Sequence, residues 1–131
     1  MRVLVENTAG GKNSVARYMD SIERLWEEIG HLNVGLCLDT CHTWAGGIPT
    51  IDAVKGFKKL VKKIDLIHFN DSKDGFESSR DRHENLGKGK IPKEELEYVI
   101  KNAKTDIIVE TPNGPDAQKK DIAWIRRRLK K

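Results

Sequence analysis

Carboxylate and histidine side chains stand at the ends of four short β-rich runs. The runs are residues 3–6, 34–39, 64–69 and 106–110, and a carboxylate or a histidine lies at or next to the end of each. Successive runs are about one βα unit of roughly 30 residues apart, and parallel strands at that spacing bring their carboxyl ends to one face of the molecule. We therefore expect four side chains to lie close together: Glu6, Asp39, His68 and Glu110.

The alternation of side chains along a strand supports this grouping. Residues two apart share a face, so Cys37 lies on the side of Asp39, with Leu36 and Leu38 on the other. A group of three buried carboxylates would repel itself unless a cation lay among them. Three carboxylates and one imidazole are suitable ligands for zinc, and manganese is an alternative.

A second set of metal-binding residue types follows in the loops. His42 comes three residues after Asp39, on the predicted loop that leaves the strand, and Asp81 and His83 lie in the long loop 70–91. A loop of about twenty residues without obvious secondary structure is usually functional. We expect His42, Asp81 and His83 to hold a further metal ion, with one position open for water or phosphate.

Each β-rich run precedes a segment with helical spacing of its apolar residues. These segments are 14–29, 51–61, one that begins at Pro92 and one that begins near Pro115. Regular alternation of strand and helix predicts an α/β fold with a parallel sheet flanked by helices. Part of an eight-stranded (βα)8 barrel and a small doubly wound sheet both fit, although the glycine-rich phosphate motif of the second is absent.

Composition and charge narrow the class of protein. The 131 residues are 37% hydrophobic and 34% charged, with a net charge of +4, which fits one domain over residues 1–131 and permits DNA as a partner. No apolar run reaches the roughly 18 residues of a membrane helix, and the amino-terminal segment lacks a signal-peptide pattern. We expect a cytoplasmic protein with no membrane partner. Cys37 and Cys41 are predicted to be buried, reduced thiols.

Five segments resemble the signature segments of endonuclease IV. They are VENTAG (5–10), GLCLDTCH (35–42), HFNDSK (68–73), DRHENLGKGKI (81–91) and IIVETP (107–112). They occur in the order and at the spacing of that family, and the LDTCH and DRH segments are the most specific. The resemblance implies the carboxy-terminal half of a barrel of the xylose-isomerase-like TIM barrel superfamily. This half-barrel would contain four consecutive βα units and lack the amino-terminal strands.

The same resemblance implies a centre of three zinc ions. Glu6 would bridge the first and second ions. The first ion would keep only Glu6 here, because its two histidine ligands in the family come from earlier strands that have no counterpart in this sequence. The second ion would be completed by Asp39, His68 and Glu110, and the third would be held by His42, Asp81 and His83.

The implied reaction is hydrolysis of the DNA phosphodiester bond on the 5′ side of an abasic site, which leaves a 3′-hydroxyl in base excision repair. Glu6 and Glu110 are the catalytic candidates, because a pair of ions bridged by Glu6 could hold the attacking hydroxide and Glu110 could orient it. Basic residues in loops of the same face could contact phosphates of double-stranded DNA, which fixes position without reading sequence. These candidates are Lys12, Lys73, Arg80, Arg82, Lys88 and Lys90.

Two alternatives remain open from the sequence. A sugar isomerase or epimerase with a similar barrel also binds metal through acids and a histidine at strand ends, although that chemistry does not require the ligands Asp81 and His83. The other alternative is a half-barrel that binds metal or DNA without catalysis. Because an open four-stranded sheet leaves two edges and an apolar face exposed, we also expect a homo-oligomer or a complex with a complementary half-barrel.

Overall fold

Four parallel strands form the central sheet of the protein. The structure, a computed structural model, describes residues 1–130. The sheet has the order β1-β2-β3-β6, with β1 (Val3–Glu6), β2 (Val34–Asp39), β3 (Leu66–His68) and β6 (Asp106–Ile108). The four predicted parallel strands are confirmed, and β1 and β2 have the predicted bounds. Strands β3 and β6 are shorter than the β-rich runs that predicted them.

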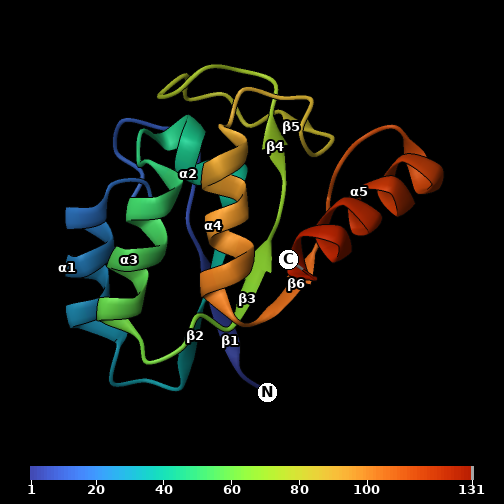
Figure 1. The fold of residues 1–131 in the computed structure, drawn as a ribbon. Coiled ribbons are helices and arrows are strands. Elements are labelled where there is room, and N and C mark those ends of the chain that lie inside the picture. The colour runs from blue at the N-terminus through green and yellow to red at the C-terminus, as the bar shows by residue number, and fades with distance from the viewer. Residues whose placement is uncertain (131) are drawn as a thin grey trace.

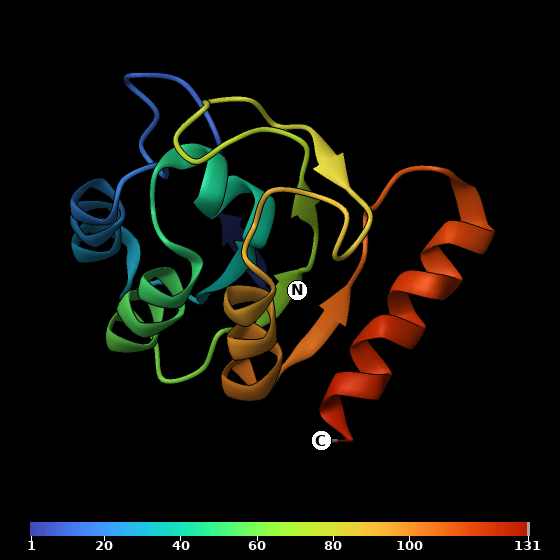
Figure 2. The same ribbon diagram turned by 45° about the horizontal axis from the view of Figure 1, so that its top comes forward.

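A long helix follows each of these strands, either directly or after a connecting segment. The helices are α1 (Met19–Ile29), α3 (Thr50–Leu60), α4 (Lys93–Ala103) and α5 (Gly114–Leu129). Figures 1 and 2 show α1, α3 and α4 side by side along one side of the sheet, with α5 beside β6. We call the side that these helices cover the helix-facing side, and the other the inner side. Within residues 1–130, no helix combines the length and the apolar character that a membrane span requires.

Helix α1 begins five residues later than the apolar spacing predicted. The backbone before it serves the loop that follows β1: the Thr8 amide donates to the Ala16 carbonyl at 2.9 Å, and the Ser14 amide donates to the Gly11 carbonyl at 3.2 Å. Residues 15–17 form turns, and the Ala16 carbonyl is engaged across the loop instead of accepting a helical hydrogen bond.

The core lies between the sheet and its helices. Leu36, Leu38, Ile67 and Phe69 are fully or almost fully buried on the helix-facing side, against side chains such as Phe57, Leu96 and Val99 of α3 and α4. Burial of each such side chain stabilises the folded state by about 1.5–3 kcal/mol. On the inner side, Ile108 stays 48% exposed. This contrast confirms the predicted alternation along the strands.

His42 was predicted on a loop, and that prediction is wrong. It lies in the first turn of a short helix, α2 (Thr40–Gly46), which starts directly after β2. The Asp39 carboxylate caps this helix by accepting a hydrogen bond from the His42 amide at 2.9 Å. Because α2 has only seven residues, it contains too few apolar positions to give a helical pattern in the sequence.

The long segment 70–91 contains two short strands and is held by one buried carboxylate. Strands β4 (Asp71–Ser72) and β5 (His83–Glu84) pair in antiparallel fashion. The Asp71 side chain accepts hydrogen bonds from the amides of Gly87 and Gly89 at 3.0 Å each and of Ile91 at 3.1 Å. The segment was predicted to lack secondary structure. The pairing it does have, together with these hydrogen bonds, gives the residues around Asp81 and His83 a fixed place.

Candidate metal centre

The carboxyl ends of the four sheet strands bring the first predicted set of ligands together. Glu6, Asp39 and His68 are the last residues of β1, β2 and β3, and Glu110 follows β6 by two residues. Asp39 and His68 are direct neighbours in the sheet register. One potential ligand atom from each of the four residues lies within 4.8 Å of the others. We call Glu6, Asp39, His68 and Glu110 the strand-end cluster.

Charge within the strand-end cluster is concentrated and partly buried. His68 Nδ1 lies 3.1 Å from Glu6 Oε1 and 3.2 Å from Glu110 Oε2, so one imidazole stands between two carboxylates. Asp39 is fully buried. Burial raises the pKa of Asp39 and the nearby Glu6 carboxylate adds to the rise, although His42 and His83 oppose it. A cation bound beside Asp39 would favour the charged form of this buried carboxylate.

The second predicted set of ligands also assembles. The Nε2 atoms of His42 and His83 lie 3.0 Å and 3.1 Å from the two carboxylate oxygens of Asp81. The two imidazole rings are 5.8 Å apart between centroids. Two carboxylates of the first set approach the second set: Glu6 Oε1 lies 3.4 Å from His42 Nδ1, and Asp39 Oδ2 lies 3.7 Å from His83 Nε2. We call His42, Asp81 and His83 the loop cluster, and Asp39 connects it to the strand-end cluster.

The hydrogen bonds of the two histidines fit a metal ion in the loop cluster. His42 Nδ1 donates to the Asn7 carbonyl at 2.7 Å, and His83 Nδ1 donates to the Glu110 carbonyl at 3.1 Å. Because a carbonyl can only accept, each Nδ1 carries the proton and each Nε2 has a free lone pair. Among the described residues, these two Nε2 atoms are the buried side-chain polar atoms without a hydrogen-bond partner. Two lone pairs and a carboxylate that converge in this way suit zinc.

Proton binding would compete with a metal at His42. Burial lowers the pKa of His42, but the Asp39 carboxylate and the Asn7 carbonyl raise it by more, so the net pKa lies above the ordinary value. A proton on Nε2 would occupy the position of the metal, since the ligand form of histidine is neutral. Any metal binding to the loop cluster would therefore weaken as the pH falls.

Two asparagines that the sequence analysis missed position the ligands. Asn7 accepts a hydrogen bond from the Asp39 amide at 2.8 Å, and its side chain donates to the Asp39 carbonyl at 3.2 Å. Asn70 donates to Asp39 Oδ2 at 2.9 Å and accepts from the Glu110 amide at 2.8 Å. Both side chains are buried. Their only signal in the sequence is that each closely follows a predicted ligand, Glu6 or His68.

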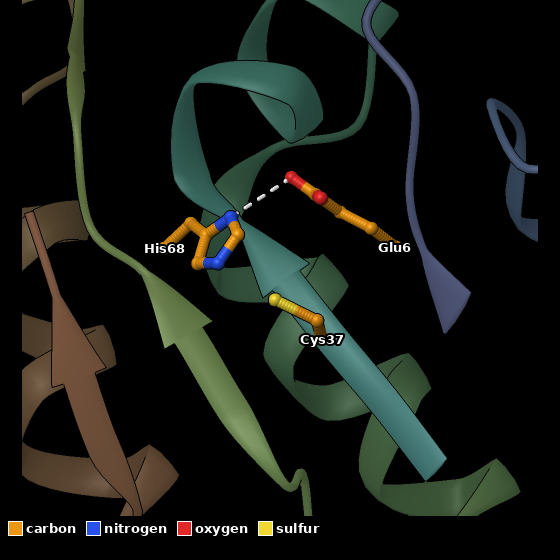
Figure 3. A group of neighbouring side chains, drawn as sticks. All are labelled: Glu6, Cys37 and His68. Atoms are coloured by element: carbon orange, nitrogen blue, oxygen red, sulfur yellow. Dashed lines mark hydrogen bonds and ion pairs between the residues drawn. The ribbon is translucent and has the colours of Figure 1, made fainter. Parts of the chain in front are cut away.

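Cys37 lies on the inner side of the sheet beside the strand-end cluster. It is the register partner of Glu6, and Figure 3 shows its sulfur close to the facing side chains of Glu6 and His68. Burial raises the pKa of the Cys37 thiol to about 12, and the Glu6 carboxylate contributes to the rise. Cys37 and Cys41 are both free and buried, as predicted. Without a bound cation, Cys37 is therefore a neutral thiol that lines the site.

The basic residues proposed for DNA contacts are all exposed, but they are not equivalent. Lys73 and Arg82 border a cleft of about 370 Å³ that also includes Asp81, His83 and Glu110. The Arg82 guanidinium is already held by Asp74, through hydrogen bonds of 2.7 Å and 2.5 Å. Arg80 lies 3.8 Å from the same carboxylate. The remaining candidates, Lys12, Lys88 and Lys90, are exposed loop residues outside this cleft.

Comparison with known proteins identifies the family. A family model described as xylose isomerase-like TIM barrel matches residues 1–128. The chain belongs to this family. The parallel βα units and the metal-binding residue types at the carboxyl ends of the strands are therefore parts of a TIM barrel, and the doubly wound alternative is excluded.

Curated relatives narrow the resemblance within the xylose isomerase-like TIM barrel family. Proteins named "Probable endonuclease 4" from Mycobacterium ulcerans and Mycobacterium tuberculosis are 46% and 48% identical to this chain over 127 and 126 residues. The aligned parts are 97% and 96% of this chain but 50% and 49% of those proteins. The chain thus spans about half the length of the curated relatives it matches. The resemblance to endonuclease IV that the motifs predicted is confirmed.

A solved structure supports the same conclusion. Endonuclease IV from Thermus thermophilus superposes with a TM-score of 0.80 at 31% identity, which covers 98% of this chain and 50% of that one. Because four βα units match half of a TIM barrel protein, the fold is a half-barrel, as predicted. The strand-end cluster and the loop cluster lie at the carboxyl ends of the strands, the face where TIM-barrel enzymes carry their active sites.

Proposed function

We propose that this chain is the metal-binding half of a zinc-dependent endonuclease that acts on double-stranded DNA in base excision repair. The reaction would be hydrolysis of the phosphodiester bond 5′ to an abasic site, leaving a 3′-hydroxyl. One observation carries the proposal: the unpartnered, buried Nε2 atoms of His42 and His83 converge on Asp81, next to the strand-end cluster. Similarity to proteins named endonuclease 4 supports the substrate class.

The two clusters divide the ligands among ions as the family resemblance implies. The loop cluster would hold one zinc, and Asp39, His68 and Glu110 would hold another together with Glu6. Glu6 would also bridge to a further ion, for which residues 1–130 offer no additional histidine next to Glu6. Manganese is the alternative occupant, since it accepts the same oxygen and nitrogen ligands. Zinc would supply positive charge that offsets the phosphate and makes a nearby water more acidic.

The chain's own carboxylates have distinct roles in the proposed reaction. Glu6 and Glu110 are 35% and 43% exposed in their side chains, whereas Asp39 is fully buried. A substrate could therefore reach the partly exposed carboxylates of Glu6 and Glu110 but not Asp39. We assign Glu110 to orient the attacking water, because its carboxylate borders the cleft and its backbone amide is fixed by Asn70. His68, 3.1–3.2 Å from both carboxylates, holds Glu6 and Glu110 at the same point.

Lys73 is the best-supported of the proposed phosphate contacts. It is exposed, borders the cleft beside Glu110, and has no ion-pair partner among the described residues. Arg82 borders the same cleft but would have to exchange Asp74 for a phosphate. Arg80 shares that carboxylate. Lys12, Lys88 and Lys90 remain candidates on loops of the same face, and a cytoplasmic location is part of the same proposal.

The direct test is strand cleavage by the zinc-loaded chain. A duplex with one abasic site and a 5′ label should yield a single product whose 3′ end a DNA polymerase can extend. The same duplex with an intact base and the Glu110→Gln variant are the controls, and both should give no product above background. If the chain binds zinc but leaves the abasic duplex intact, the proposed activity does not belong to this chain alone.

The sugar isomerase or epimerase alternative is tested with the same preparation. The loop cluster favours the nuclease, because isomerisation of a sugar needs no ion held by Asp81 and His83. Conversion of a ketose by the zinc-loaded or manganese-loaded chain, with no cleavage of abasic DNA, would replace the proposed function by this alternative.

A further inference from the structure

Each of the two metal-binding clusters has a buried thiol beside it. Cys37 and Cys41 are 3% and 0% exposed, and both are free. Cys37 lies on the inner side of β2, and Cys41 lies in the first turn of α2, four residues further along the chain. Neither sulfur belongs to the oxygen and nitrogen ligand sets proposed for zinc. The two thiols therefore add a third kind of ligand atom to the same region.

Cys37 completes a mixed ligand group with two members of the strand-end cluster. One potential ligand atom each of Glu6, Cys37 and His68 lies within 4.8 Å of the other two. Cys37 pairs with Glu6 in the sheet register and stands two residues before Asp39 on the same side of β2. Figure 3 shows the Cys37 sulfur directed toward the His68 ring, with the Glu6 carboxylate close to both. A sulfur, an imidazole nitrogen and a carboxylate oxygen thus converge at this point.

Cys41 stands in the same relation to the loop cluster. Its sulfur, one carboxylate oxygen of Asp81 and one ring nitrogen of His83 also lie within 4.8 Å of one another. The thiol donates a weak hydrogen bond to the Arg82 carbonyl, with 3.7 Å between sulfur and oxygen. Because Arg82 lies between Asp81 and His83 in the chain, this contact holds the sulfur against the backbone that carries both ligands.

The sulfur-containing groups overlap with the ligand sets proposed for zinc. The Cys37 group uses Glu6 and His68 of the strand-end cluster, and the Cys41 group uses two of the three members of the loop cluster. A neutral imidazole has one lone pair for a metal, so His68 can serve only one ion at a time. At each cluster, an ion bound through sulfur therefore competes with an ion bound through oxygen and nitrogen alone.

The choice between the two kinds of group depends on the softness of the ion. Thiolate ligands favour soft ions, whereas carboxylates favour hard ones such as manganese. The strand-end cluster offers three carboxylates and one imidazole, and the Cys37 group replaces two of those carboxylates by one sulfur. An ion softer than zinc gains most from this replacement. The thiol proton passes to solvent when the sulfur binds the ion, because a coordinating thiol is deprotonated.

We propose that the two thiols provide sites for a thiophilic divalent ion, such as cadmium, that competes with zinc for this centre. One site is formed by Cys37, Glu6 and His68, and the other by Cys41, Asp81 and His83. The inference rests on the proposed metal centre and names the class of ion that disables it. An ion held by Cys37 withdraws Glu6 and His68 from zinc, so cadmium inhibits the reaction that the zinc-loaded centre performs.

Ultraviolet absorption of sulfur bound to cadmium tests the two sites. The metal-free, reduced chain is titrated with cadmium, and the sulfur-to-cadmium charge-transfer band should grow until one ion is bound for each thiol. Cys37→Ser and Cys41→Ser should each lose one of the two contributions to the band. The double variant should bind cadmium without the band, through its carboxylates and imidazoles. A band of full height in either single variant would overturn the assignment of that thiol.

The relative affinities for cadmium and zinc separate a ligand from a residue that only supports the fold. Cys37→Ser should weaken cadmium binding at least about tenfold, since it loses a direct ligand. It should leave zinc binding unchanged, because the proposed zinc ligands contain no sulfur. The matched control is His31→Ala, an exposed histidine outside both clusters, which should change neither affinity. Equal losses of cadmium and zinc affinity in Cys37→Ser would overturn the proposal.

A cadmium NMR spectrum of the unmodified chain gives the same answer without any variant. Bound cadmium should resonate in the range of ions with sulfur ligands, well separated from that of ions with oxygen and nitrogen ligands alone. Bound cadmium without the sulfur signal would overturn this proposal and leave the proposed nuclease unaffected. Conversely, a zinc-loaded chain that leaves abasic DNA intact would count against the nuclease but not against cadmium bound through sulfur.

Discussion

At the scale of single residues, the proposed function depends on the direction of two imidazole nitrogens. The Nδ1 proton of His83 is fixed by the Glu110 carbonyl, which leaves Nε2 for a metal. We expect His83→Ala to reduce the zinc content by about one ion per chain, because Asp81 and His42 alone provide too few ligands. Zinc analysis after gel filtration measures this. The control, His31→Ala, removes an exposed histidine outside both clusters and should leave the zinc content unchanged. Equal zinc in His83→Ala and the unmodified chain would contradict the assignment.

The ion pair between Asp74 and Arg82 can also be tested, through the pH at which the Asp74 carboxyl titrates. Hydrogen bonds from Arg82 hold the pKa of the Asp74 carboxyl below its ordinary value. A carboxyl whose pKa is depressed by folding contributes stability above its unfolded pKa, and that contribution is lost as the pH falls through the folded pKa. Titration followed by NMR of the Asp74 carboxyl carbon should give a midpoint below 3.8, and Arg82→Gln should return it toward that value. An unchanged midpoint in Arg82→Gln would mean that Arg82 is free for DNA.

Residue types in the sequence were sufficient to find the metal-binding candidates but not the residues that position them. Glu6, Asp39 and His68 could be predicted because strand ends of parallel βα units must meet at one face. Asn7 and Asn70 could not, since their part is to hydrogen-bond the backbone and carboxylate of Asp39 and the amide of Glu110. The amide of a loop asparagine can donate to or accept from many groups, so its hydrogen-bond partners cannot be predicted before the fold is known.

At the scale of elements, one buried carboxylate organises the segment 85–91. Both oxygens of Asp71 accept backbone amides, and an asparagine has only one such oxygen. We expect Asp71→Asn to lower the free energy of unfolding by about 2–4 kcal/mol, because its amide group would face backbone donors. Urea unfolding at neutral pH measures the change. The matched control, Asp52→Asn on the exposed side of α3, should cost less than about 1 kcal/mol. Equal effects of the two substitutions would show that the Asp71 hydrogen bonds do not stabilise the segment.

The elements that the sequence predicted well are those whose own residues show a recognisable pattern of apolar side chains. Helices α3, α4 and α5 have apolar periodicity that matches their buried faces, and strands β1 and β2 are runs rich in valine and leucine. Helix α2 and strands β4 and β5 have seven, two and two residues, which is too short for a period to appear. They form because tertiary contacts hold them: Asp39 caps α2, and Asp71 and Asp121 hold the chain that follows β5 through Gly87 and Asn85.

At the scale of the whole molecule, the metal-binding clusters are built by the fold and exist only in it. The ligand candidates come from β1, β2, α2, β3, the segment around β5 and the residues after β6. Most of these elements are tens of residues apart along the chain, so an unfolded chain would separate their ligand candidates. Metal binding at these clusters would therefore be coupled to folding, because a bound cation would offset the repulsion among the carboxylates of the inner side.

Zinc should consequently stabilise the entire chain. A ligand that binds only the folded state adds about 2.7 kcal/mol per site when its free concentration is 100 times its dissociation constant. We expect the urea midpoint at neutral pH to rise with zinc and to fall with a chelator, at one fixed chain concentration so that any association is constant. Manganese should give a smaller rise at the same concentration, because it binds nitrogen and oxygen ligands more weakly than zinc. In the double variant His42→Ala/His83→Ala, zinc should raise the urea midpoint by less than in the unmodified chain but not by zero, since the strand-end cluster is intact. In His31→Ala, zinc should raise the midpoint as much as in the unmodified chain. Identical unfolding curves with zinc and with chelator would mean that the acids and imidazoles gathered at the strand ends do not bind the ion.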